Sequence, residues 1–133
     1  MHLSQRVSQI YGVVFVIVAI VGLFTSGGSM QSDPAVAPRL FGLFPVNLLH
    51  NLFHLAWGGW GLVAAREWIT AQRYLMATAV VYLILAVLGY ITPSMYGLLP
   101  IGGNDIWLHI VLAVVAGAVA LSDRRAPVES DAR

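Results

Sequence analysis

Two pairs of residues with metal-binding side chains stand out in a chain of 133 residues that is otherwise largely apolar. His50 and His54 form the first pair, and Asp105 and His109 form the second. Residues four apart lie on one face of an α-helix, about 6 Å apart along its axis, so each pair presents two ligands together. Three imidazoles and one carboxylate suit a divalent ion such as Zn²⁺ in tetrahedral geometry. Amides that could support these ligands as hydrogen-bond partners lie close by in the sequence, at Asn47, Asn51 and Asn104.

The same cluster is also consistent with roles that need no such metal site. Hydrogen bonds from Asp105 to histidine or asparagine would fix the register of helices that have no hydrophobic reason to associate in lipid, which predicts a structural or accessory protein rather than an enzyme. His54 and His109 are alternatively the opposed axial ligands of a b-type haem, although small residues on the same faces leave little room for a macrocycle. A bound divalent metal could instead activate water, which would make the protein a membrane hydrolase. The sequence leaves these alternatives open, together with transport or proton transfer.

The composition indicates an integral membrane protein. Hydrophobic residues make up 59% of the chain and charged residues 10%, and the mean hydropathy is +0.80. The chain has no cysteine, which excludes disulfides, iron–sulfur clusters and cysteine nucleophiles. A formal charge of +1 argues against a nucleic-acid partner. We expect the lipid bilayer to be the main partner, and we expect a homo-oligomer or a larger membrane complex because four short helices bury little of their own surface.

Four apolar stretches are long enough to cross ~30 Å of hydrocarbon as helices, which needs roughly 20 residues. Six of the seven arginines lie near the termini or between the second and third stretches. The positive-inside rule therefore places both termini in the cytoplasm and the metal-binding pairs near the outer face. We predict one domain over 1–133, with a disordered cytoplasmic tail at 123–133. The predicted spans lie near 8–26, 45–65, 74–92 and 104–122.

Two similar turns precede the second and fourth predicted helices. The segments "GLFPVN" (42–47) and "GLLPIG" (97–102) each place glycine and proline just ahead of a histidine-bearing helix. We predict that both prolines, Pro45 and Pro100, occupy the first turn of a helix, where the missing N–H is not needed. The Gly/Pro/Ser-rich stretch before Arg39 is expected to be irregular. The segment that follows it, up to Pro45, is expected to lie along the membrane interface.

The chain reads as two tandem helical hairpins. Residues 12–25 align without gaps with 79–92, and six of the fourteen paired residues are identical. A second offset, of 55 residues, pairs the second helix with the fourth and brings the two polar pairs into register. The repeats cover about 8–66 and 74–122, and each has an even number of spans, so a pseudo-twofold axis along the membrane normal should relate them. The predicted fold is therefore an all-α integral membrane protein, a four-transmembrane-helix bundle, whose first span is a retained helix rather than a signal peptide.

Small residues continue down the two polar faces. Gly58 and Gly61 follow His54 on the second helix, and Ala113 and Ala116 follow the histidine of the fourth. Small residues at such spacing let membrane helices approach closely. We therefore predict that the second and fourth helices pack against each other across the pseudo-twofold axis, with the four candidate ligands converging above the contact.

Three runs carry a resemblance to a known family: "GLFPVNLLHNLFHLAWGGWGL" (42–62), "RYLMATAVVYLILAVLGYI" (73–91) and "LPIGGNDIWLHIVLAVVAG" (99–117). The most specific pieces are His-Asn-x-x-His at 50–54 and Asn-Asp-x-x-Leu-His at 104–109. With these motifs the chain resembles a bacterial family of small four-span membrane proteins catalogued as domain of unknown function number 4383. The resemblance implies a multi-pass protein of the bacterial plasma membrane, and it implies no activity.

Overall fold

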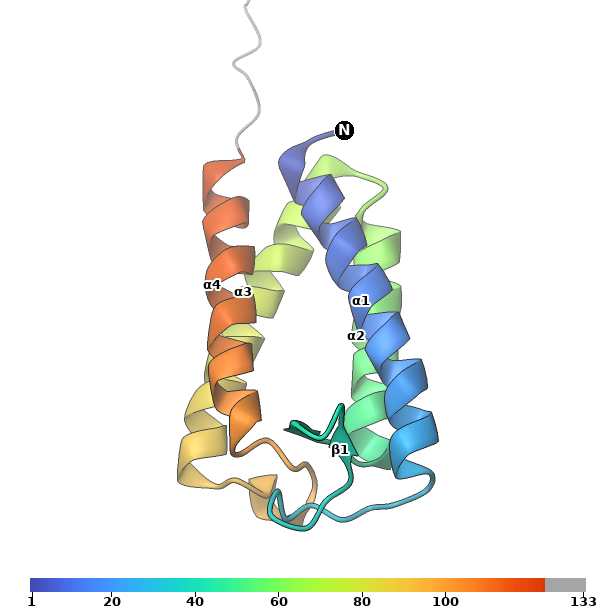
Figure 1. Cartoon of the computed structure of the whole chain (residues 1–133). Helices are drawn as coiled ribbons and strands as arrows, with labels where there is room; N and C mark the ends of the chain where they lie inside the picture. The colour runs from blue at the N-terminus through green and yellow to red at the C-terminus, as the bar shows by residue number, and fades with distance from the viewer. Residues whose placement is uncertain (124–133) are drawn as a thin grey trace, which may run out of the picture.

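Four α-helices and one short β-hairpin form the computed structural model, which describes residues 1–123 (Figure 1). The all-helical fold class is confirmed, and a small two-stranded element is added to it. The predicted tail lies outside the described residues except for Asp123, which is ordered. In chain order the elements are α1 (Leu3–Ser26), β1 (Arg39–Leu40), β2 (Phe44–Pro45), α2 (Leu48–Ala64), α3 (Trp68–Ile91), the short 3₁₀ helix η1 (Met95–Gly97) and α4 (Asn104–Ser122).

Three helices, α1, α3 and α4, are long and apolar enough to cross a membrane, which is compatible with a multi-pass membrane protein. The helix α2 has 17 residues and is shorter than these three. The helix α4 has the predicted bounds, whereas α1 begins at Leu3 and α3 at Trp68, ahead of the predicted spans. The apolar runs mark only the hydrocarbon-length part of each helix, and polar residues continue α1 and α3 beyond it.

Consecutive helices pack as pairs, α1 with α2 and α3 with α4 (Figure 1). Gly58 of α2 lies against α1 so closely that a Cβ atom there would be 2.9 Å from the carbonyl oxygen of Gly12. A Cβ atom on Gly61 would be 2.8 Å from the ring of Tyr74 in α3. The prediction that α2 and α4 pack directly is therefore wrong: their contact is marginal at most, and the small residues of α2 face α1 and α3.

Aromatic rings fill the space between the two helix pairs. Phe15 of α1 and Tyr82 of α3 are buried with their ring centroids 5.4 Å apart. Ala113 and Ala116 of α4 are buried in the same core. These alanines therefore make room for rings from neighbouring helices instead of for the backbone of α2, which is why α2 and α4 stay apart.

The turns before α2 and α4 differ from the prediction. Pro45 lies in β2, and α2 starts only at Leu48, because Asn47 caps it by accepting the backbone N–H of His50 at 2.8 Å. The helix α4 likewise begins four residues after Pro100. Neither proline occupies a helix's first turn, and the polar cap rather than the proline sets where α2 begins.

The segment predicted to lie along the membrane interface folds into the β-hairpin. Arg39 pairs with Pro45 and Leu40 with Phe44 in antiparallel register. The turn between the strands has positive φ at Phe41 (53°) and Gly42 (71°), the pattern of a type I′ turn. The hairpin contacts α1 through β1 and α4 through β2, so it fills one end of the bundle between the two helix pairs (Figure 1).

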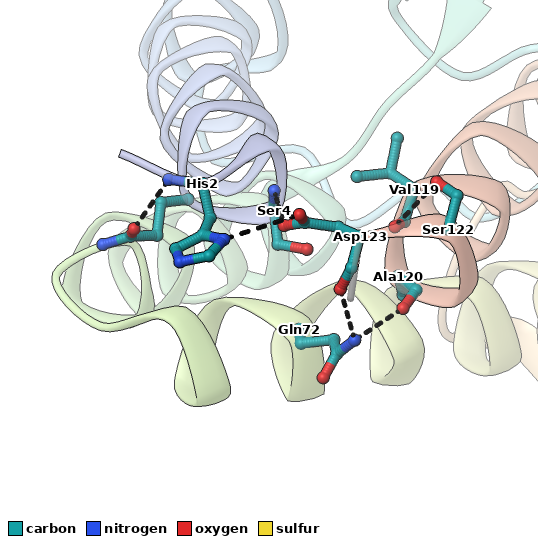
Figure 2. Close-up of polar contacts among 8 residues, drawn as sticks. His2, Ser4, Gln72, Val119, Ala120, Ser122 and Asp123 are labelled. Carbon is teal, nitrogen blue, oxygen red and sulfur yellow. Dashed lines mark hydrogen bonds and ion pairs between the residues drawn. The ribbon is translucent and has the colours of Figure 1, made fainter. Parts of the chain in front are cut away.

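Asp123 joins the other end of the bundle, where α1 begins and α4 ends. Its Oδ2 accepts the backbone N–H of Ser4 at 2.6 Å, and its Oδ1 lies 3.6 Å from Nδ1 of His2. Gln72 of α3 donates to the carbonyl oxygens of Ala120 and Asp123 at 2.8 and 3.0 Å. Figure 2 shows these contacts, which tie three helix ends together across long sequence separations.

We expect Asp123→Asn to lower the thermal stability at pH 7 by on the order of 1 kcal/mol, the usual effect of a lost charged helix cap. Burial alone would raise the pKa of Asp123, but the hydrogen bonds from Ser4 and the nearby His2 outweigh it and lower that pKa. A lowered folded-state pKa means that the stabilisation is present above the unfolded-state pKa and is lost as the pH falls through the folded-state value. Melting curves of wild type and variant should therefore converge in acid.

The matched control for this prediction is Glu67→Gln. Glu67 precedes α3, and its side chain makes no capping hydrogen bond. Both carboxylates lie at the start of a helix, but only Asp123 accepts a backbone N–H there, so Glu67→Gln should lower the melting temperature by less than Asp123→Asn does. A gap between Asp123→Asn and wild type that is constant with pH would show that the carboxylate charge at the start of α1 contributes nothing.

Candidate metal centre

Three buried side chains from α2 and α4 converge near the hairpin end of the bundle. His50 lies in the first turn of α2, Asp105 in the first turn of α4, and His109 one turn further along α4. Each offers one ligand atom, and the three ligand atoms lie within 4.8 Å of one another. Sequence spacing placed Asp105 and His109 on one helix face, and the structure brings both of them beside His50.

The three side chains lie close together but do not form hydrogen bonds with one another. His50 Nε2 and Asp105 Oδ2 are 3.8 Å apart, which is too long for a hydrogen bond. His50 Nδ1, Asp105 Oδ2 and His109 Nδ1 are buried, and none of them has a hydrogen-bond partner among the described residues. Buried polar atoms are normally paired, because leaving one unpaired costs roughly 1–3 kcal/mol. Such a convergence of unpaired donors and acceptors is the arrangement that a cation or a bound polar ligand completes.

His54, the fourth predicted ligand, lies next to this group but outside it. Its ring centroid is 4.5 Å from that of His50, and it stacks on Phe15 of α1 at 5.5 Å. Its Nδ1 is buried without a hydrogen-bond partner among the described residues. The structure therefore brings together three of the four predicted ligands and leaves His54 at their edge.

The three asparagines bond to backbone groups and to neighbouring side chains rather than to an imidazole or the carboxylate. Asn47 caps α2 and also donates to the carbonyl of Leu98 at 2.8 Å, linking α2 to the loop before α4. Asn51 donates to Ser26 Oγ at 2.9 Å, at the end of α1. Asn104 donates to the carbonyl of Leu43 at 3.1 Å and accepts from the indole of Trp107. They hold the helix ends that carry the ligands, and Asn47 does so through the backbone of His50.

Tyr82 is a site residue that the sequence analysis did not single out. Its ring lies edge-on to His109, with centroids 5.1 Å apart, and its buried hydroxyl has no hydrogen-bond partner among the described residues. A signal was present, because the alignment of the first and third helices pairs Tyr82 with Phe15, the residue that stacks on His54. His54 and His109 thus each contact an aromatic ring from the neighbouring helix.

A cavity of about 360 Å³ adjoins the cluster. Apolar residues of α1, α4 and the β-hairpin make up almost all of its lining, which also includes His50, His54, Asp105, His109 and Tyr82. This volume falls within the range of small-molecule sites, roughly 300–1,000 Å³. The lining residues are Ile10, Tyr11, Val14, Phe15, Val18, Leu40, Phe41, Phe44, Val46, His50, His54, Tyr82, Asp105, Leu108, His109 and Leu112.

Comparison with known proteins gives a family and no activity. No curated protein and no solved structure matches this chain. The model of one family, "Domain of unknown function (DUF4383)", matches residues 5–122, a range that contains almost all of the four helices, the hairpin and the whole candidate centre. The chain therefore belongs to the DUF4383 family.

Proposed function

We propose that the protein is a four-span membrane protein that binds one divalent transition metal through His50, Asp105 and His109. The observation that carries this proposal is the convergence of three buried side chains, each with a ligand atom within 4.8 Å of the other two and each with a buried nitrogen or oxygen atom that lacks a partner among the described residues. A hydrogen-bond network with only a structural role would be expected to satisfy these atoms internally. Zn²⁺ is the ion we expect, and Fe²⁺ suits the same ligands.

The ligand geometry is close to what a metal requires. Metal–ligand bonds of about 2.0–2.2 Å to nitrogen and oxygen place the ligand atoms of a tetrahedral ion roughly 3.4 Å apart. The ligand atoms lie within 4.8 Å of one another, so binding requires the two imidazoles and the carboxylate to rotate toward the ion. Three protein ligands leave at least one coordination position open, which is typical of catalytic rather than structural zinc sites. The open position and the adjoining cavity favour a metal-dependent hydrolase as the activity, with water activated at the metal.

Contacts within the two helix pairs support an origin as two tandem hairpins. The offsets of 67 and 55 residues convert the Phe15–His54 contact into the Tyr82–His109 contact. They also convert the approach of Gly12 to Leu62 into that of Ala79 to Gly117. A paired contact preserved under both offsets is what a duplicated hairpin would leave behind.

The same paired arrangement supports a topology in which α2 also crosses the membrane. Seventeen residues span about 25 Å at 1.5 Å each, and this is at the lower limit for a spanning helix. The start of α1 and the end of α4 lie at one end of the bundle (Figure 1), as an even number of crossings demands. Arg6, Arg66 and Arg73 belong to this end, and from the positive-inside rule we infer that it faces the cytoplasm of a bacterium, with the candidate metal centre near the outer face of the plasma membrane.

Metal analysis of purified protein tests the metal proposal. Wild-type protein in mild detergent, without added metal, should contain about one divalent transition metal per chain, and His50→Gln should lose it. His54→Gln is the matched control, because it removes a histidine from the same helix one turn away, and it should retain the metal. Equal metal in His50→Gln and wild type, or no metal in either, would reject the site.

An absorption spectrum of the same samples separates the metal from a haem. The haem alternative expects a Soret band that disappears in His54→Gln, whereas the proposed site gives no such band. Under the metal hypothesis His50→Gln loses the ligand and His54→Gln retains it, whereas under the haem hypothesis His54→Gln loses the Soret band. One set of preparations therefore decides between the two hypotheses.

A further inference from the structure

The cavity beside the candidate metal centre has two chemically distinct parts. Its walls are aliphatic along α1 and α4, including Val14, Val18, Leu108 and Leu112. The three candidate ligands also line it, with His54 and Tyr82 beside them. A cavity whose lining is almost wholly apolar and that reaches only a few polar groups matches an amphiphile with a long apolar chain and a small head group.

The cavity is open toward the side of the bundle. Ile10 and Val14 line the cavity and are also 59% and 47% exposed on the flank of α1. Since α1 has the length and composition of a membrane span, this flank faces acyl chains in a bilayer. Toward the end of the bundle the hairpin region lines the cavity with Leu40, Phe44 and Val46, and with Phe41, which is 71% exposed. A ligand therefore enters from the lipid between α1 and α4, which contact each other only lightly.

The net charge of the proposed metal site determines the charge of the head group that would bind there. A divalent ion with one carboxylate and two neutral imidazoles leaves a net charge of +1 in a buried site, and an uncompensated buried charge is costly. An anionic oxygen ligand at the open coordination position neutralises that charge. We propose that the cavity binds a single-chain lipid carboxylate, a fatty acid, with its chain between α1 and α4 and its carboxylate on the metal. This inference rests on the proposed metal centre.

The walls allow the chain-binding part to be tested without touching the metal ligands. Val14→Trp places a large ring in the cavity from its rim, and Val13→Trp places the same ring on the adjacent position of α1. Val13 is similarly exposed, at 43%, and does not line the cavity. Wild type and both variants are reconstituted in phosphatidylcholine nanodiscs, and binding of tritiated dodecanoate is measured beside metal content on the same samples.

We expect dodecanoate to bind metal-loaded wild type and Val13→Trp alike, and to bind Val14→Trp about tenfold or more weakly, with equal metal in all three. Dodecanol, which has the same chain and no charge, should bind wild type about tenfold or more weakly than dodecanoate does. Equal dodecanoate binding by the two tryptophan variants would overturn the cavity assignment and leave the metal centre standing. Equal binding to metal-loaded and chelator-treated protein would overturn the head-group assignment. Absence of metal from all three proteins would instead reject the metal centre itself.

Discussion

Replacing Gly58 by leucine should prevent the protein from folding stably. A Cβ atom at Gly58 would lie 2.9 Å from both the carbonyl oxygen of Gly12 and the backbone nitrogen of Val16. Backbone atoms cannot rotate away as a side chain can, so α1 and α2 would have to separate along their main contact. Overpacking of this kind costs about 3 kcal/mol or more when the backbone must move, which is a large part of a typical stability of 5–15 kcal/mol.

The neighbouring glycine supplies the control for this prediction. A Cβ atom on Gly59 would meet nothing within 4 Å, so Gly59→Leu should leave the melting temperature unchanged or raise it slightly. Both variants add the same side chain to the same helix, and only the face differs. The measurement is the yield of monodisperse protein and its melting temperature in detergent. If Gly58→Leu melts within a degree or two of Gly59→Leu, α1 and α2 do not pack as described.

The long apolar helices could be predicted from the sequence because their signal is local. The bounds of α4 agree with the apolar run at 104–122, since polar or small residues flank that run closely. The starts of α1 and α3 could not be located in the same way, because helices continue into polar segments while hydropathy does not. The β-hairpin was missed because its strands are two residues each, too short to show an alternating pattern.

The site could be predicted in part, for a similar reason. Spacing of four residues puts Asp105 and His109 on one face of α4 whatever the rest of the chain does. Which helix that face meets depends on packing across the bundle, and aromatic rings such as Tyr82 decided it by keeping α2 and α4 apart. His50 reaches the α4 ligands, whereas His54, one turn deeper, stacks on Phe15.

Asp105→Asn distinguishes a metal site from a structural hydrogen-bond network, because the two hypotheses predict opposite changes in the stability of the protein. In metal-free protein Asp105 Oδ2 is buried without a hydrogen-bond partner among the described residues. Burying a carboxylate costs several kcal/mol, whereas its favourable position at the start of α4 contributes less than about 1 kcal/mol. Removing the charge should therefore leave the metal-free protein as stable as the wild type, or more stable.

Bound metal should reverse the order of stability, so that the wild type becomes more stable than Asp105→Asn. An ion that binds only the folded state stabilises it by about 2.7 kcal/mol when present at 100 times its Kd, so Zn²⁺ should raise the melting temperature of wild type by several degrees. Asp105→Asn lacks the anionic ligand and should show no such rise, and wild type should overtake it as Zn²⁺ is added. Melting curves with chelator and with Zn²⁺ measure both effects. If Asp105→Asn is the less stable protein by the same margin in both conditions, Asp105 serves an internal hydrogen-bond network, because only a metal ligand makes the cost of losing the carboxylate depend on the ion.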